Sequence, residues 1–162
     1  MKKTKSMMMK IVFFIIGFTL TLNAQDINLD KLSKEAVNKH VLVFFHMTHC
    51  PYCEKMLEKS FNDPVLKKVL NKNFIIADIN INTGGKIKYK DFEGSKYNFS
   101  EAQNIHFYPT VLFINDENKI VYSVKGYRNK EKFSTILNYI KSNSYVEMSY
   151  DGYLDDLEFN KE

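Results

Sequence analysis

The stretch that decides the fold reads V-L-V-F-F-H-M-T-H-C-P-Y-C and runs from Val41 to Cys53. Its first part, up to His46, is almost entirely β-branched or aromatic, which is typical of a strand buried on both faces. Its last part, Cys50-Pro51-Tyr52-Cys53, contains the only two cysteines among the 162 residues. Because a helix-like segment follows from Glu54, the pattern predicts a buried strand that delivers two thiols to the first turn of a helix.

Two thiols at this place are typical of a dithiol/disulfide redox site. The free N–H groups and the positive dipole end of a helix stabilise the thiolate of the first cysteine, and only the thiolate is nucleophilic. Pro51 suits the first helical turn, where its missing N–H is not needed. The alternative is a disulfide that merely staples the chain. It is disfavoured because a two-residue gap closes too small a loop to stabilise the fold much.

Residues 1–24 have the composition of a secretory signal peptide. Four lysines form a basic start, the 12 residues from Ile11 to Leu22 are apolar but short for a membrane span, and Ala24 offers a small residue before Gln25. An uncleaved membrane anchor is the competing interpretation, because Leu22 is not the small residue favoured at that position. We therefore expect a periplasmic or otherwise exported protein.

The charge balance excludes one class of partner. Four of the 23 basic residues lie in the segment 1–24 and none of the 19 acidic residues does, so the remainder carries 19 of each. The basic character belongs to the export segment and gives no reason to expect nucleic-acid binding. An exported chain with two cysteines allows one disulfide.

Hydrophobic periodicity predicts a single α/β domain over residues 25–142. Residues 82–95 are polar and glycine-containing, so they are expected to form an insertion or a hairpin with an edge strand at 86–90. A parallel start that ends in an antiparallel hairpin predicts a mixed central sheet of four to five strands with helices on both faces. The expected helices cover 26–38, 51–70 with a break at Asp63-Pro64, 100–104 and 129–142; the expected strands cover 41–46, 74–81, 110–114 and 120–124.

Residues 143–162 form an acidic C-terminal extension, with six acids against Lys161. The pattern favours a solvated extension with one short helix near 153–159, packed onto the domain through aromatic residues. The other interpretation is that the lysine-rich insertion and this acidic tail dock a partner, which describes a non-enzymatic adaptor.

Taken with Tyr108-Pro109-Thr110, the strand at 111–114 and Gly126 before the closing helix, the cysteine motif resembles the thioredoxin-like superfamily. The resemblance covers residues 27–142 and is strongest for exported bacterial proteins of thiol–disulfide interchange. It implies a three-layer sandwich.

The resemblance also implies the roles of the site residues. Cys50 is then the nucleophile and Cys53 the resolving thiol of a thiol–disulfide oxidoreductase that needs no cofactor besides its own disulfide. Pro109 is expected to be cis, with Tyr108 and Thr110 flanking a substrate groove and Tyr52 shaping the surface. The implied partners are client proteins with cysteines and an envelope thiol–disulfide donor or acceptor of electrons.

Three departures from that family leave the redox direction open, with reduction preferred. Phe44 stands where reducing thioredoxins bury an acid. The Pro-Tyr dipeptide matches glutaredoxins, but Tyr108-Pro109 lacks their Thr-Val-Pro, so dependence on glutathione is not expected. His49 is a candidate for stabilising the Cys50 thiolate as an imidazolium, which would make the disulfide more oxidising. The alternative is an exposed loop histidine without effect.

A metal-binding or metal-delivery protein on the same fold is the main rival. Several side chains in and near the cysteine motif are of the kinds that bind Cu(I) or Zn(II). These side chains are those of His46, Met47, His49, Cys50, Cys53 and Met56. The preferred interpretation, a thiol–disulfide oxidoreductase, includes no metal site. A c-type haem is excluded there, because Glu54 stands where the ligand histidine should follow.

Overall fold

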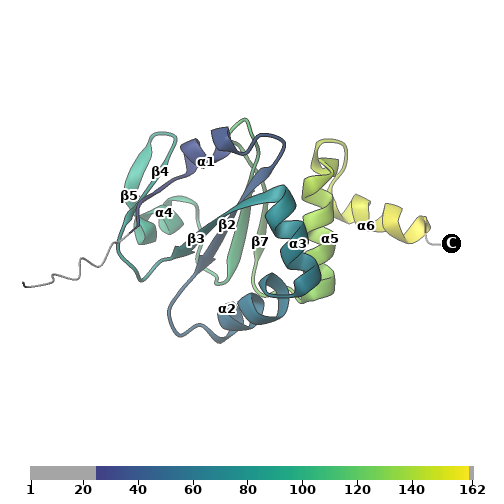
Figure 1. Cartoon of the computed structure of the whole chain (residues 1–162), viewed down its shortest axis with the longest axis horizontal. Helices are drawn as coiled ribbons and strands as arrows, with labels where there is room; N and C mark the ends of the chain where they lie inside the picture. Colours follow the sequence, from purple (N-terminus) through teal and green to yellow (C-terminus); the bar gives the residue numbers. More distant parts are fainter. Residues whose placement is uncertain (1–24, 161–162) are drawn as a thin grey trace, which may run out of the picture.

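The computed structural model describes residues 25–160 (Figure 1), so the predicted signal peptide at 1–24 and the last two residues lie outside the described part. Among the helices of residues 25–160, none is long and apolar enough to cross a membrane. In chain order the elements are β1 Ile27–Asn28, α1 Leu29–Glu35, β2 His40–His46, α2 Pro51–Met56, a π-helical stretch Leu57–Phe61, α3 Pro64–Asn73, β3 Phe74–Asn80, β4 Lys86–Tyr89, β5 Phe92–Ser95, α4 Lys96–Ala102, β6 Thr110–Ile114, β7 Ile120–Lys125, α5 Lys130–Lys141, a 3₁₀ turn Ser144–Val146 and α6 Tyr150–Phe159.

The central sheet has four strands in the order β3-β2-β6-β7. Strands β2 and β3 are parallel over seven residue pairs, from His40 opposite Phe74 to His46 opposite Asn80. Strand β6 runs antiparallel to both β2 and β7. The predicted mixed sheet is therefore confirmed, and β2 lies inside it, as its unbroken apolar sequence requires.

Side chains of β2 alternate between two cores, because successive residues of a strand point to opposite faces. Leu42 and Phe44 join a cluster with the buried residues of α3 and α5. Val43 and Phe45 join a second cluster that contains residues of α1 and α4. Helices thus cover both faces of the sheet (Figure 1), which confirms the three-layer architecture.

The helical segment after the cysteines breaks where proline predicts it. Asp63 caps α3, because its side chain accepts from the main-chain N–H groups of Val65 and Leu66, and Pro64 occupies the first turn. Lys130 Nζ lies 2.7 Å from Asp63 Oδ2, which joins this cap to the start of α5. The neighbouring lysine and the two N–H groups hold the pKa of Asp63 below its ordinary value.

The predicted insertion at 82–95 forms the β4–β5 hairpin, and β1 adds to it as a parallel third strand. This second sheet was not predicted. It shortens the first helix, which was expected from residue 26 and begins at Leu29 after an Asn28 cap. The helix expected at 100–104 begins earlier, at Lys96, because the Ser95 side chain caps it.

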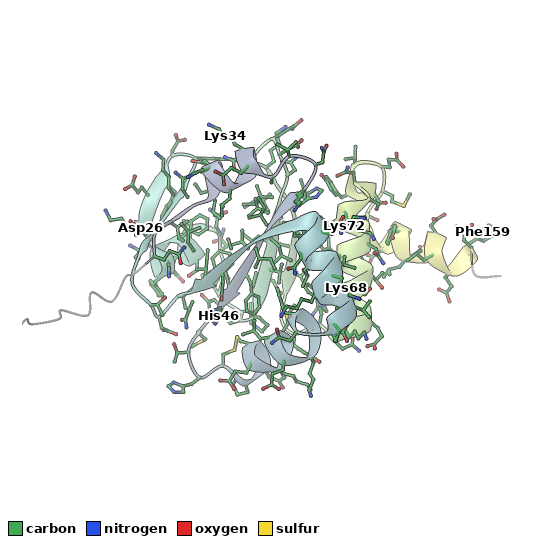
Figure 2. The ribbon with its side chains drawn as sticks, viewed as in Figure 1. Asp26, Lys34, His46, Lys68, Lys72 and Phe159 are labelled. Atoms are coloured by element: carbon green, nitrogen blue, oxygen red, sulfur yellow. A yellow bond between two sulfur atoms is a disulfide. The ribbon has the colours of Figure 1, made fainter. Side chains whose placement is uncertain are left out.

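The C-terminal extension packs through aromatic rings, as predicted. Tyr139 of α5 is buried, and its ring lies within 6.4 Å of three tyrosine rings of the extension. Its hydroxyl donates to the Met148 carbonyl at 2.7 Å. Figure 1 shows α6 projecting away from the layered domain, and Figure 2 labels Phe159 near its tip. We call the packed set the tyrosine cluster; it comprises Tyr122, Tyr139, Tyr145, Tyr150 and Tyr153.

Candidate active site

The two cysteines lie at the connection between strand β2 and helix α2 and in the first turn of that helix. Strand β2 ends at His46, three exposed residues follow, and Cys50 then caps the helix with extended dihedral angles of −104° and 103°. The main-chain N–H of Cys53 points at the Cys50 Sγ atom, 3.2 Å away. Pro51 occupies the first helical turn, as predicted. The N–H of Cys53 also donates to the Cys50 carbonyl at 3.0 Å. The sequence thus places the first sulfur at the start of a helix, where a thiolate is stabilised.

Cys50 and Cys53 form a disulfide, with their Cα atoms 5.2 Å apart. The two residues differ in exposure: Cys50 is 9% exposed and Cys53 is 1% exposed. This is the order expected for an attacking and a resolving thiol, whose roles stay predictions.

Pro109 follows a cis peptide bond after Tyr108, as the sequence predicted. Its carbonyl accepts a hydrogen bond of 2.7 Å from the N–H of Gly126, which adopts a positive φ of 84°. The Tyr108 hydroxyl donates to Ser100 and to the Ile105 carbonyl, and Thr110 is buried and donates to the Phe107 carbonyl. Both side chains are therefore engaged inside the domain, and a substrate role for this segment rests on its main chain.

Three exposed or partly exposed aromatic rings lie next to the motif and the Pro109 turn. Tyr52 is 63% exposed, and its ring centroid lies 6.5 Å from that of Tyr127. Lys55 Nζ lies 4.9 Å from the centre of the Tyr127 ring. Phe107, just before the cis bond, is 67% exposed. Tyr127 and Phe107 were not predicted from the sequence. Their positions were a usable clue, because Tyr127 directly follows Gly126 and Phe107 directly precedes Tyr108.

Phe44 is buried against the ring of Phe61, at 4.8 Å, and stacks on His46, at 5.2 Å. Phe44 belongs to the same buried hydrophobic cluster as both cysteines. His46 Nε2 is buried and lies 2.6 Å from Asp78 Oδ1. The angles at this contact do not meet hydrogen-bond geometry, so the pair is an ionic contact rather than a hydrogen bond. Figure 2 shows His46 at the lower edge of the sheet, from which the chain runs to the disulfide.

The structure brings together only part of the predicted soft-ligand set. Within residues 25–160 no group of three or more His, Cys, Asp or Glu side chains lies close enough to share a metal ion. His46 faces Asp78, and His49 is exposed in the loop with a positive φ of 57°. The metal-binding alternative therefore stays a prediction.

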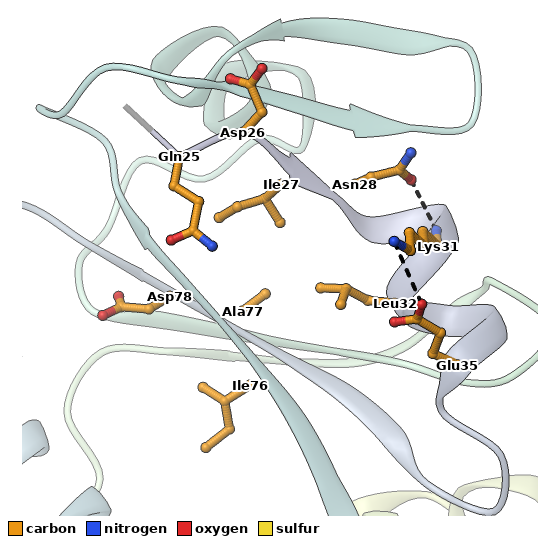
Figure 3. Close-up of a pocket in the computed structure, with 10 residues that line it drawn as sticks. All are labelled: Gln25, Asp26, Ile27, Asn28, Lys31, Leu32, Glu35, Ile76, Ala77 and Asp78. Atoms are coloured by element: carbon orange, nitrogen blue, oxygen red, sulfur yellow. Dashed lines mark hydrogen bonds and ion pairs between the residues drawn. The ribbon is translucent and has the colours of Figure 1, made fainter. Parts of the chain in front are cut away.

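A cavity of about 490 Å³ lies away from the motif, between α1 and β3 (Figure 3). Ile27, Leu32 and Ile76 line it together with polar side chains, and none of its lining residues belongs to the segment 50–53. Strand β3 is an edge strand of the central sheet, and Ile76 is 40% exposed.

A four-stranded mixed sheet, helices on both faces and a helix-capping disulfide next to a cis-proline turn define a thioredoxin-like protein with the site of a thiol–disulfide oxidoreductase. The chain belongs to the thioredoxin-like domain family, whose model matches residues 29–141. No curated protein matches the sequence.

Solved structures show the same fold at low sequence identity. A thioredoxin-fold protein from Helicobacter pylori is 22% identical over 74% of this chain and 79% of its own, with a TM-score of 0.58. A thioredoxin from Thermus thermophilus is 20% identical over 72% of this chain and 87% of its own, with a TM-score of 0.55. The oxidised C-terminal domain of DsbD from Neisseria meningitidis is 18% identical over 71% of this chain and 89% of its own, with a TM-score of 0.51.

Proposed function

We propose that this protein is an exported thiol–disulfide oxidoreductase that acts on protein thiols and disulfides of the cell envelope, in the reducing direction. The observation that carries the proposal is the pairing of Cys50, which is 9% exposed and has its Sγ against the Cys53 N–H, with a second cysteine that is only 1% exposed. Of the two cysteines, Cys50 is the more accessible to a client, whereas Cys53 is enclosed beside it.

The reaction starts from the reduced pair. The Cys50 thiolate attacks one sulfur of a client disulfide, a Cys50–client bond forms, and the client's other sulfur leaves as a thiolate. The Cys53 thiol then loses its proton and attacks Cys50 Sγ. The intramolecular disulfide forms and the second client sulfur is released, so two electrons pass from the protein to the client. The same steps run backwards oxidise a client dithiol.

Client recognition is assigned to the exposed rings and to the main chain before Pro109. The Tyr108 side chain is turned inside, so its main chain remains to pair with an extended client segment, as an added strand does. Tyr52, Tyr127 and Phe107 supply apolar contact beside it. The partners in this proposal are cysteine-containing clients and an envelope thiol–disulfide protein that restores the reduced pair.

Replacement of the resolving thiol tests the exchange chemistry. In Cys53→Ser, the mixed disulfide through Cys50 has no internal route to release, so clients should accumulate on the protein when envelope extracts are separated on non-reducing gels. The double variant Cys50→Ser/Cys53→Ser is the matched control and should trap nothing. An absence of trapped clients in Cys53→Ser would count against exchange chemistry altogether.

The reduction potential of the Cys50–Cys53 pair tests the direction separately. A reduction potential of about −270 mV suits a reductant, and a potential of about −120 mV suits an oxidant. Equilibration of the purified protein with glutathione redox buffers, followed by thiol trapping, gives this number. A potential at the oxidising end would overturn the reducing direction while leaving the exchange reaction in place.

A further inference from the structure

The loop between β2 and Cys50 is bound by hydrogen bonds to the end of β3 and to the residues that follow it. Parallel strands end at the same edge of a sheet, so the residues after His46 and those after Asn80 meet. The main-chain N–H of Thr48 donates to Asn82 Oδ1 at 2.9 Å. The Thr48 hydroxyl accepts from Asn80 Nδ2 at 3.2 Å. Thr48 is thus bound through its main chain and its side chain.

The two asparagines are themselves fixed. Asn80 Oδ1 accepts from the N–H of Asn82 at 3.0 Å, which orients the Asn80 amide with its nitrogen toward Thr48. The Asn80 carbonyl accepts from the Thr83 hydroxyl at 2.9 Å, and that hydroxyl accepts from Lys96 Nζ at 3.0 Å. Lys96 is 7% exposed. A chain of hydrogen bonds therefore runs from the buried start of α4, through the beginning of the insertion, to the loop before the cysteines.

The loop needs such an anchor because of its backbone. His49 lies between Thr48 and Cys50 with a φ of 57°, in the left-handed region that a residue with a Cβ seldom occupies. Such a conformation persists where the surrounding structure holds it. Cys50 comes next, and its dihedral angles set the position of Sγ against the N–H of Cys53.

We propose that Asn82 is a positioning residue for thiol–disulfide exchange, an inference that rests on the proposed function. Its side chain holds Thr48, and Thr48 holds the left-handed turn that keeps Cys50 Sγ on the Cys53 N–H. That contact favours the thiolate of the reduced protein. Loss of the anchor lets the turn relax, reduces the thiolate fraction at neutral pH and makes the disulfide relatively more stable. The insertion at 82–95 thereby acquires a function at the site.

Titration of the Cys50 thiolate tests this assignment. In a Cys53→Ser background Cys50 is the only thiol, and its absorbance at 240 nm reports the thiolate as pH changes. Asn82→Ala should move the titration midpoint to higher pH and slow alkylation by iodoacetamide at neutral pH about fivefold, the size expected for one lost hydrogen bond. In the protein with both cysteines, Asn82→Ala should also lower the reduction potential.

Two further variants make the outcome decisive. Asn71→Ala removes an exposed asparagine of α3 and should leave the titration unchanged. Thr48→Val keeps the main-chain N–H but removes the hydroxyl, so a smaller shift in the same direction is expected. An unchanged titration in a folded Asn82→Ala protein overturns the proposal, and if that variant fails to fold, an unchanged titration in Thr48→Val overturns it. Failure of the unaltered protein to exchange disulfides would instead refute the proposed function, since the thiolate titration needs no client.

Discussion

The two ends of β2 are built from different chemistry, although each carries a histidine. At the start of the strand, His40 is 7% exposed, lies beside the ring of Phe74 and has its Nε2 2.9 Å from the Tyr145 hydroxyl. At the other end, His46 touches the carboxylate of Asp78, whose side chain is 63% exposed, and an exposed loop follows. One end is closed by aromatic packing and the other by polar contacts near solvent.

This difference separates stability from reactivity within one strand. Buried aromatic area stabilises the fold wherever it lies, but it gives a sulfur no access to a client. Hydrogen bonds at an exposed loop add little net stability, yet they fix the positions of individual atoms. We therefore expect substitutions at the tyrosine cluster to change the free energy of unfolding and substitutions at the loop to change the thiolate.

The largest expected effect on stability is that of Tyr139→Ala. It deletes the ring at the centre of the tyrosine cluster, and loss of a buried aromatic side chain costs about 3 kcal/mol or more. Urea unfolding followed by circular dichroism measures this loss. Tyr139→Phe, which keeps the ring and loses only the bond to the Met148 carbonyl, should cost about 1 kcal/mol. An altered alkylation rate at Cys50 in folded Tyr139→Ala protein would contradict the separation of stability and reactivity between the two ends of β2.

A smaller effect is expected at His40, and it depends on pH. Burial lowers the pKa of His40 below its ordinary value of 6.5, although the Asp116 carboxylate partly opposes the shift. The unfolded chain therefore binds a proton that the folded protein resists. This contribution to stability is fully present above about pH 6.5 and is lost as the pH falls below it.

His40→Phe isolates this contribution. At about pH 7.5 the variant should lose about 1 kcal/mol, because the contact with the Tyr145 hydroxyl is gone. Urea titrations at a series of pH values should show a shallower loss of stability toward acid in the variant than in the unaltered protein. Parallel curves for the two proteins would mean that His40 does not titrate on unfolding.

The smallest effect is expected from Asp78→Asn at the opposite end of the strand. The pair with His46 is largely solvated on the carboxylate side, and such pairs contribute less than about 1 kcal/mol. Thermal unfolding monitored by circular dichroism should therefore place this variant close to the unaltered protein. A loss as large as that of Tyr139→Ala would show that both ends of β2 are structural.

The sequence predicted the central layer well because the signals there are local and strong. An apolar run marks β2, the Asp63-Pro64 pair marks the helix break, and Tyr108-Pro109 before an apolar run marks the start of β6. The pairing of β1 with β4 escaped prediction, because two residues carry no periodicity. Their partner is chosen by contacts about 60 residues away, such as the Asp26 carboxylate with the N–H of Lys86.

The close cysteine pair and the cis bond before Pro109 were predicted, and the orientation of the side chains around them was predicted less well. The spacing of Cys50 and Cys53 is readable in any chain, whereas the direction in which Tyr108 and Thr110 point depends on hydrogen bonds formed only in the folded domain. The anchoring of Thr48 by Asn82 is hidden for the same reason. It joins residues 34 positions apart through a loop end whose composition alone reads as a polar turn.

The tyrosine cluster also determines which structural change the intrinsic fluorescence of this protein can monitor. The chain has no tryptophan, so its intrinsic emission comes from ten tyrosines. Five of them form the tyrosine cluster, which joins the C-terminal extension to β7 and α5. Rings at these separations exchange excitation among themselves, whereas only Tyr52 lies between the two cysteines. An ultraviolet fluorescence trace would therefore follow the docking of the extension, and a reporter of the redox state would need a fluorophore introduced beside the disulfide.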